Sequence, residues 1–135
     1  MKKITNITVL LGLISYLISF FLPALSITSE IELNGFSTFL INFGMLFYVE
    51  NSVEYWQYIF FILSNILAPF LFVRYWRVSA NKVLTYLVSL LAIISAIFWP
   101  FAFEDSSVLL MGYWLWLIGI VLISGAILLK RKEAE

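Results

Sequence analysis

Asn65 is the most prominent polar residue, because it lies inside a long apolar stretch and four residues before Pro69. Proline has no amide hydrogen, so a helix through this stretch leaves the carbonyl of Asn65 without its usual donor and should kink or loosen there. A freed carbonyl beside a carboxamide could coordinate a cation or a polar solute, as in interrupted transporter helices. A single membrane asparagine can also bond to neighbouring helices, and we favour this second role.

Six acidic residues are the other candidates for a site: Glu30, Glu32, Glu50, Glu54, Glu104 and Asp105. Carboxylates gathered on one face could bind a divalent cation or a basic peptide. Membrane topology alone also explains acidic residues that share one side of the bilayer. We therefore predict an acidic outer surface and no metal site.

The sequence lacks most residues and motifs that carry catalysis. It contains no cysteine and no histidine, which removes disulfide exchange and most metal and haem ligation. No glycine-rich phosphate loop, nucleophile elbow or metalloprotease motif occurs, and no charged residue lies in the centre of an apolar run, where proton relays need one. The small multidrug exporters depend on a glutamate in the first span, where this chain has only Ser15 and Ser19. We therefore predict a non-enzymatic protein without catalytic residues or cofactors.

Four long apolar runs must position these residues. Hydrophobic residues make up 63% of the chain and charged residues 12%, against about 45–50% and about 25% in ordinary globular proteins. A spanning helix needs about 20 mainly apolar residues. The 135 residues therefore predict an all-α membrane protein, a single domain that forms a four-transmembrane-helix bundle. The predicted spans are residues 4–25, 55–73, 83–99 and 108–129.

The charged residues alternate between the two sides of these spans. The basic residues lie before the first span, near the connection between the second and third, or after the fourth: Lys2, Lys3, Arg74, Arg77, Lys82, Lys130, Arg131 and Lys132. The positive-inside rule predicts a multi-pass protein of the cytoplasmic (inner) cell membrane, with both termini in the cytoplasm. Such short basic clusters suit anionic lipid rather than nucleic acid. The first run could instead be a cleaved signal, but residues 4–29 exceed the usual core of about 7–15 residues, so we keep it as a span.

Residues 26–54 form the longest connection, and we predict that they form a structured outer cap. Apolar and polar residues alternate over 27–34, which favours a short extended segment, and Asn34-Gly35 is a turn signal. Residues 36–49 are apolar but too few to span, which favours an interfacial or re-entrant helix. A function that depends on an outside partner is expected in this cap.

Small and hydroxyl residues recur at helical spacing along the spans, which predicts the faces where helices touch. The candidate helix-packing residues are Gly12, Ser15, Ser19, Ser89, Ala92, Gly112 and Gly119. Tryptophans are expected at the membrane interfaces. Trp76 is assigned to the inner interface, and the outer one is assigned Trp56, Trp99, Trp114 and Trp116.

Several short motifs carry a resemblance to known proteins. They are residues 19–24 (SFFLPA), Asn34-Gly35-Phe36 with Phe39, Ser64-Asn65, and residues 112–117 (GYWLWL). Together they resemble small uncharacterised bacterial four-span integral membrane proteins, a resemblance that covers most of the chain and implies no activity or site residues. The long first outer loop is also similar to the layout of claudin-like proteins, but their paired loop cysteines and tryptophan motif are missing.

These patterns favour a membrane interaction protein, either an accessory subunit or an immunity-type protein that blocks a toxin or pore former. Besides the lipid bilayer, the expected partner is another membrane protein or further copies of the same chain. The outer cap and the small-residue helix faces would bind it. The alternative is a small oligomeric channel or carrier for an uncharged or weakly charged solute, with Asn65 and the serine and threonine stripes along its path.

Overall fold

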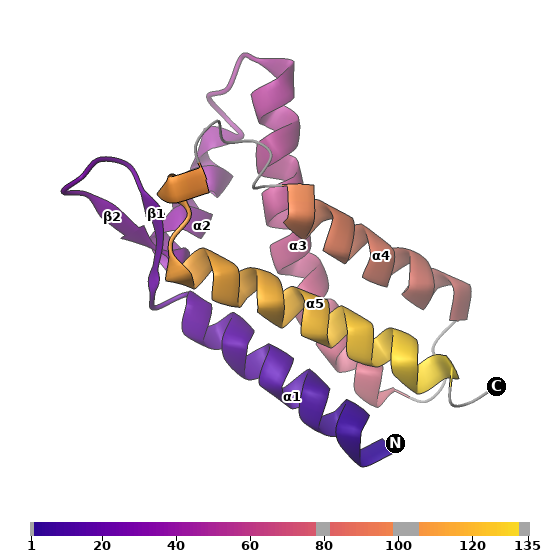
Figure 1. The fold of residues 1–135 in the computed structure, drawn as a ribbon. Coiled ribbons are helices and arrows are strands. Elements are labelled where there is room, and N and C mark those ends of the chain that lie inside the picture. Colours follow the sequence, from indigo (N-terminus) through magenta and orange to yellow (C-terminus); the bar gives the residue numbers. More distant parts are fainter. Residues whose placement is uncertain (1, 78–81, 99–105, 133–135) are drawn as a thin grey trace.

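The computed structural model describes residues 2–77, 82–98 and 106–132. In chain order (Figure 1), the elements are α1 (Lys2–Ser19), β1 (Pro23–Ser26), β2 (Glu32–Asn34), α2 (Gly35–Met45), α3 (Ser52–Trp76), α4 (Lys82–Phe98), the 3₁₀ turn η2 (Ser106–Val108) and α5 (Met111–Lys132). The described residues are mostly helical, which confirms this part of the prediction.

Two helices in the described part are long and apolar enough to cross a membrane, α3 over Ser52–Trp76 and α5 over Met111–Lys130. The apolar segments of α1 (Lys3–Ser19) and α4 (Val83–Phe98) are shorter. At about 1.5 Å per residue, the 18 residues of α1 and the 17 of α4 extend about 27 and about 25 Å. These lengths are slightly below the roughly 30 Å of a bilayer's hydrocarbon core.

α5 lies between α1 and α4, and α3 crosses behind it (Figure 1). Two glycines bring α1 and α5 into main-chain contact. A methyl group added at Gly119 would lie 2.7 Å from the amide nitrogen of Tyr16 and 2.8 Å from the carbonyl oxygen of Gly12. One added at Gly12 would lie 3.0 Å from the carbonyl oxygen of Gly119. The absence of side chains at both positions therefore permits this close helix crossing.

The helices bury a compact core and expose large apolar side chains on their outer faces. Leu71, Ile120 and Ile123 are almost completely buried where the helices meet. Isoleucines are exposed on the outer face of each long helix, among them Ile14, Ile66, Ile94 and Ile118. Extended exposed apolar surface of this kind marks a protein that contacts a membrane or other proteins.

The predicted first span is wrong at its C-terminal end, because α1 ends at Ser19 rather than at residue 25. The amides of Phe20 and Phe21 bond to carbonyls three residues earlier, which closes the helix with a tight turn. Pro23 then disfavours helical geometry at the residue before it, and the chain continues as β1. The other three long helices begin and end within three residues of the predicted spans.

The extended segment predicted over 27–34 is confirmed in part, because residues 32–34 form β2, one strand of an antiparallel hairpin. β1 and β2 pair with Leu25 opposite Leu33. Residues 27–31 form the turn between them, where the amide of Ile31 donates to the hydroxyl oxygen of Thr28 at 3.1 Å. The predicted segment began too early, because Ile27 and Ile31 belong to the turn, where their side chains are exposed.

The predicted turn at Asn34-Gly35 is the junction between the hairpin and α2. The side-chain oxygen of Asn34 accepts a hydrogen bond from the amide of Ser37 at 2.8 Å and so caps the helix. α2 has 11 residues and ends at Met45, so it occupies most of the apolar segment 36–49. β2 therefore passes into α2 without an intervening loop.

Candidate functional site

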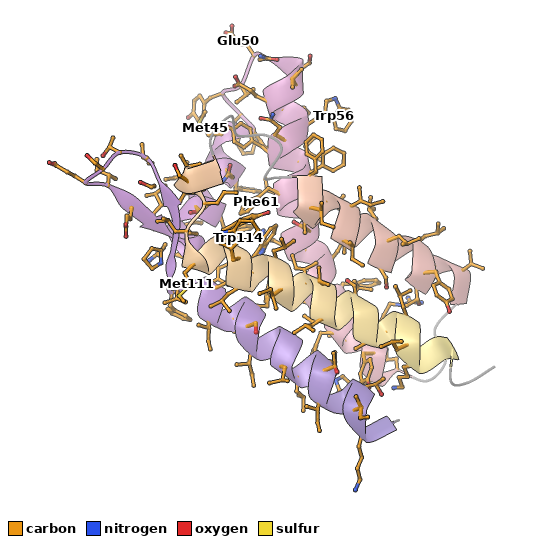
Figure 2. The ribbon with its side chains drawn as sticks, viewed as in Figure 1. Met45, Glu50, Trp56, Phe61, Met111 and Trp114 are labelled. Atoms are coloured by element: carbon orange, nitrogen blue, oxygen red, sulfur yellow. The ribbon has the colours of Figure 1, made fainter. Side chains whose placement is uncertain are left out.

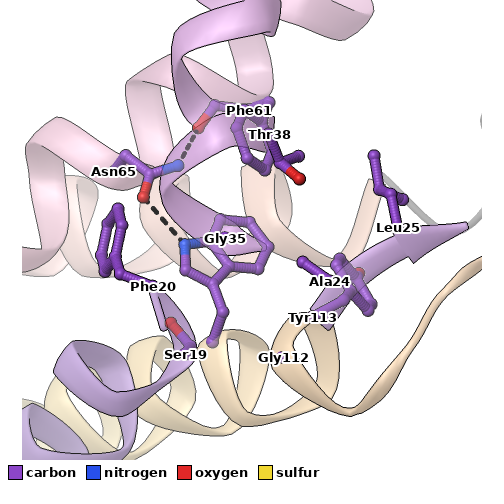
Figure 3. A pocket seen from close by; sticks show the side chains of 11 residues that line it. Ser19, Phe20, Ala24, Leu25, Gly35, Thr38, Phe61, Asn65, Gly112 and Tyr113 are labelled. Carbon is purple, nitrogen blue, oxygen red and sulfur yellow. Dashed lines mark hydrogen bonds between the residues drawn. The ribbon is translucent and has the colours of Figure 1, made fainter. Parts of the chain in front are cut away.

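Asn65 lies at a buried junction of three helices. Its side-chain oxygen accepts a hydrogen bond from the indole nitrogen of Trp116 on α5 at 2.9 Å. Its side-chain nitrogen donates to the carbonyl of Phe61 on α3 at 2.9 Å (Figure 3). The hydroxyl of Tyr16 on α1 lies 3.3 Å from the same side-chain oxygen.

The same tyrosine compensates for Pro69. α3 continues through Pro69, which offers no amide hydrogen to the carbonyl of Asn65. The hydroxyl of Tyr16 donates to this carbonyl at 3.0 Å. A hydroxyl has only one hydrogen to donate. Of the two oxygens that Asn65 offers, the carbonyl is nearer to the Tyr16 hydroxyl than the side-chain oxygen is. The backbone group that proline leaves without a donor is therefore satisfied from α1.

This geometry limits what Asn65 can bind. Its side-chain oxygen and its carbonyl both accept hydrogen bonds, and its side-chain nitrogen donates one of its two hydrogens. A cation would have to displace the bonds to these two oxygens before Asn65 could coordinate it. In this arrangement Asn65 links α1, α3 and α5 rather than presenting a vacant ligand set.

A small cavity adjoins Asn65 where α1, β1, α2, α3 and α5 converge (Figure 3). Its lining residues are Ser19, Phe20, Ala24, Leu25, Gly35, Thr38, Phe61, Asn65, Gly112, Tyr113 and Trp116. The centre of a water-sized sphere can move within about 20 Å³, which is room for about one water molecule. The hydroxyls on its wall already bond elsewhere: that of Thr38 donates to Asn34, and that of Tyr113 donates to the carbonyl of Ala96. The cavity therefore has the size of a water site.

The candidate helix-packing residues lie mostly inside the bundle. Gly12, Ser19, Ser89, Ala92, Gly112 and Gly119 are buried, and Ser15 is half-buried beside them. A methyl group at Gly112 would lie 2.7 Å from the carbonyl oxygens of Leu22 and Pro23. Glycine at this position therefore lets the start of α5 approach the hairpin.

Three buried hydroxyls differ from the rest, because they have no hydrogen-bond partner within the described residues. They belong to Ser89 and Ser95 on α4 and to Ser124 on α5, and all three residues are fully buried. A buried hydroxyl without a partner raises the free energy of the folded state. These three hydroxyls therefore retain their full bonding capacity inside the bundle.

The structure does not assemble the acidic residues into a site. Glu30 and Glu32 are exposed on the hairpin, while Glu50 and Glu54 are exposed near the start of α3, where Glu50 points away from the bundle (Figure 2). Glu104 and Asp105 fall outside the described residues. Within the described ranges, no group of three or more acidic residues is placed to hold a metal ion.

A second polar junction joins the opposite ends of the same three helices. The ammonium of Lys130 on α5 donates to the carbonyl of Tyr75 on α3 at 2.8 Å and lies 4.0 Å from the centre of its ring. The hydroxyl of Tyr75 donates to the side-chain oxygen of Asn6 on α1 at 2.6 Å. Arg74 bonds to Thr85 on α4 at 3.2 Å. Two of the basic residues, Arg74 and Lys130, thus bond helix ends together.

Sequence reasoning missed Tyr16 and misplaced Trp116. Trp116 was expected at the outer interface, but it is buried and bonds to Asn65. A signal was present, because Trp116 lies four residues after Gly112 and three before Gly119, on one helical face. Trp99 lies outside the described residues, while Trp56, Trp76 and Trp114 are exposed.

Two polar junctions and the contact between Gly12 and Gly119 hold the bundle together. Most of the buried polar groups described above bond to one another or to the backbone. Comparison of the chain with protein-family models, curated protein sequences and solved structures gave no match in any of the three.

Proposed function

We propose that this chain is a four-span membrane protein of the cytoplasmic membrane, with both termini in the cytoplasm. Two helices have the length and apolar character for a span, and α1 and α4 are each close to one bilayer core in length. Their exposed faces carry isoleucine and leucine, which are favourable in lipid and unfavourable in water. The alternation of basic and acidic segments supports the orientation.

Within that membrane, the protein acts by binding another membrane protein rather than by catalysis. The observation that carries this proposal is the rigid attachment of the β1–β2 hairpin. The amide of Leu110 donates to the carbonyl of Ala24 at 2.9 Å, so β1 is bonded on both edges. The amides of Gly35 and Phe36 donate to the carbonyls of Leu22 and Phe20 at 3.1 and 3.0 Å. A surface held in this way loses little conformational entropy on binding.

The hairpin turn offers an apolar centre with an acidic rim. Ile27 and Ile31 are 60% and 52% exposed, and Glu30 and Glu32 are exposed beside them. The turn would suit a partner with an apolar patch bordered by lysine or arginine, since opposite charges at a rim guide association and orientation. An accessory subunit or an immunity-type protein needs such a surface and no titratable catalytic group.

The test is affinity capture of the tagged chain from native membranes in mild detergent, with co-purifying proteins quantified by mass spectrometry. The Ile27→Ser/Ile31→Ser variant should lose a stoichiometric partner that the parent chain retains. Ile4→Ser is the matched control, because Ile4 is 67% exposed at the opposite end of α1. A partner retained equally by both variants would refute binding through the hairpin, and recovery of the chain alone would favour the second candidate.

The second candidate is a small oligomeric channel or carrier for an uncharged or weakly charged solute. The unpartnered hydroxyls of Ser89, Ser95 and Ser124 favour it, because such groups could bond to water or solute along a path. The path would have to widen, since the cavity beside Asn65 holds about one water. Solute uptake into proteoliposomes tests this candidate, which predicts that Asn65→Leu and Ser89→Ala each reduce the flux.

A further inference from the structure

The helix α2 (Gly35–Met45) has the opposite polarity from a helix that covers a protein in water. Its buried residues are polar: Thr38 is 2% exposed and Asn42 is 5% exposed. Its exposed residues are all large and apolar, and they are Phe36, Leu40, Ile41 and Phe43. An amphipathic helix in water shows the reverse distribution.

The buried polar groups of α2 bond within the helix itself. The hydroxyl of Thr38 donates to the carbonyl of Asn34 at 2.9 Å, and the side-chain nitrogen of Asn42 donates to the carbonyl of Thr38 at 2.7 Å. These donors therefore need no water. Packing of Phe39 against the bundle core fixes which side of α2 faces inward. The outward side presents apolar atoms.

The position of α2 matches the edge of the proposed membrane layer. α2 packs against α3 and the hairpin, beyond the outer end of α1 (Figure 1). Exposed aromatic side chains occur on the neighbouring segments: Phe21 follows α1, Tyr48 follows α2, and Trp56 lies near the start of α3, where Figure 2 labels it. Aromatic residues of this kind concentrate at membrane–water boundaries. With 11 residues, α2 is about 16 Å long, roughly half of a bilayer core.

We infer that α2 is an interfacial helix whose exposed face contacts the acyl chains of the outer leaflet. This inference rests on the proposed membrane placement and specifies the ligand of one surface as lipid. A protein partner is less suitable, because protein interfaces combine an apolar centre with a polar rim, whereas each exposed residue of α2 is apolar. α2 also packs on α3, one of the two described helices that are long and apolar enough to span a membrane.

The junction between β2 and α2 also limits how the hairpin can move relative to this helix. Asn34 ends β2 and caps α2, and Gly35 begins the helix. A methyl group at Gly35 would overlap the carbonyl oxygen of Ser19, so this junction is packed directly against the end of α1. The hairpin therefore cannot pivot freely on α2. A partner that binds Ile27 and Ile31 must present its own site close to the membrane surface.

The depth of single spin labels tests this inference directly, because the chain contains no cysteine. Phe36→Cys, Leu40→Cys and Phe43→Cys are labelled with a nitroxide, with Ile118→Cys as the lipid-facing control on α5 and Glu30→Cys as the aqueous control. The purified protein is reconstituted in phosphatidylcholine–phosphatidylglycerol liposomes. Collision rates with oxygen, which concentrates in lipid, are compared with those of water-soluble NiEDDA. We expect the three α2 labels to shift toward oxygen, as Ile118 does, and away from the value at Glu30.

Each other outcome overturns a defined part of the account. Labels on α2 that favour NiEDDA, with Ile118 still in lipid, would refute the interfacial helix and leave the membrane proposal intact. Low collision rates with both reagents would show that α2 is covered by protein, either a second copy or another part of the chain. A label at Ile118 that favours NiEDDA would refute the membrane placement itself.

Discussion

The contact between α1 and α5 can be tested with two alanine substitutions in one helix, Gly119→Ala and Gly125→Ala. Both glycines lie within α5, so both substitutions gain about 1 kcal/mol of intrinsic helix propensity. They differ in what the new methyl group meets. Apart from the backbone of its own helix, nothing lies within 4 Å at Gly125, whereas at Gly119 three main-chain atoms of α1 lie within 2.9 Å.

Main-chain atoms cannot rotate away from the methyl group, so α1 and α5 must separate by several tenths of an ångström to restore ordinary contact. Overpacking of this kind typically costs about 1–3 kcal/mol. After the gain in propensity, we expect Gly119→Ala to lower the free energy of unfolding by about 0–2 kcal/mol, and to lie about 1–3 kcal/mol below a Gly125→Ala variant that keeps its full gain. Gly125→Ala should leave it unchanged or raise it by up to about 1 kcal/mol. The separation would also weaken the bond from Tyr16 to Asn65, because the methyl group meets Tyr16.

The assay is unfolding of the purified variants in mixed micelles with increasing SDS, followed by circular dichroism and tryptophan fluorescence. Fluorescence is informative because Trp116 is buried three residues from the crossing. Equal stability of the two variants, or greater stability of Gly119→Ala, would contradict the close packing of α1 on α5. A lower free energy of unfolding for Gly119→Ala alone would support this packing, because both substitutions replace glycine with alanine in the same helix.

Three further substitutions test other contacts in the same unfolding assay. Asn65→Leu should lower the free energy of unfolding by about 1–3 kcal/mol, because the buried indole N–H of Trp116 loses its acceptor; an unchanged value would argue against this bond. Gly35→Ala should lower stability because its methyl group would overlap main-chain atoms at the end of α1, whereas Gly44→Ala meets nothing within 4 Å and should be tolerated. Ser89→Ala should leave the free energy of unfolding unchanged or raise it by up to about 1 kcal/mol, since the buried hydroxyl of Ser89 has no partner in the described structure. A clear decrease in the free energy of unfolding would show that this hydroxyl does have a hydrogen-bond partner.

The ends of the later helices could be predicted from the sequence, whereas the end of α1 could not be placed from hydrophobicity. Arg74 and Arg77 lie where α3 ends, so charge and helix boundary coincide. After Ser19, by contrast, the chain remains apolar through residue 25. The helix nevertheless stops, because Pro23 and the hairpin pairing compete with it locally. Hydrophobicity alone does not distinguish a buried strand from the last turns of a helix.

Asn65 could be singled out from sequence because a carboxamide is unusual in an apolar run and Pro69 follows it. Its partners could not be, since they lie 49 and 51 residues away in the chain. Their identity depends on how α1 and α5 are rotated about their axes. The glycine spacing contained part of this information, because Gly12 and Tyr16 lie on one face of α1. The prediction that Trp116 lies at the membrane interface used residue type alone. Its position on the same face of α5 as Gly112 and Gly119 indicates the burial that the structure shows.

In the proposed arrangement, four helices cross the membrane with both termini inside and the hairpin outside. Single-cysteine labelling in intact cells with a membrane-impermeant maleimide tests it most directly, since the parent chain has no cysteine. Glu30→Cys and Glu50→Cys should react in intact cells, whereas Lys3→Cys and Arg77→Cys should react only after the membrane is permeabilised. Reaction of Lys3→Cys or Arg77→Cys from outside, or protection of Glu30→Cys until permeabilisation, would contradict the four-span arrangement.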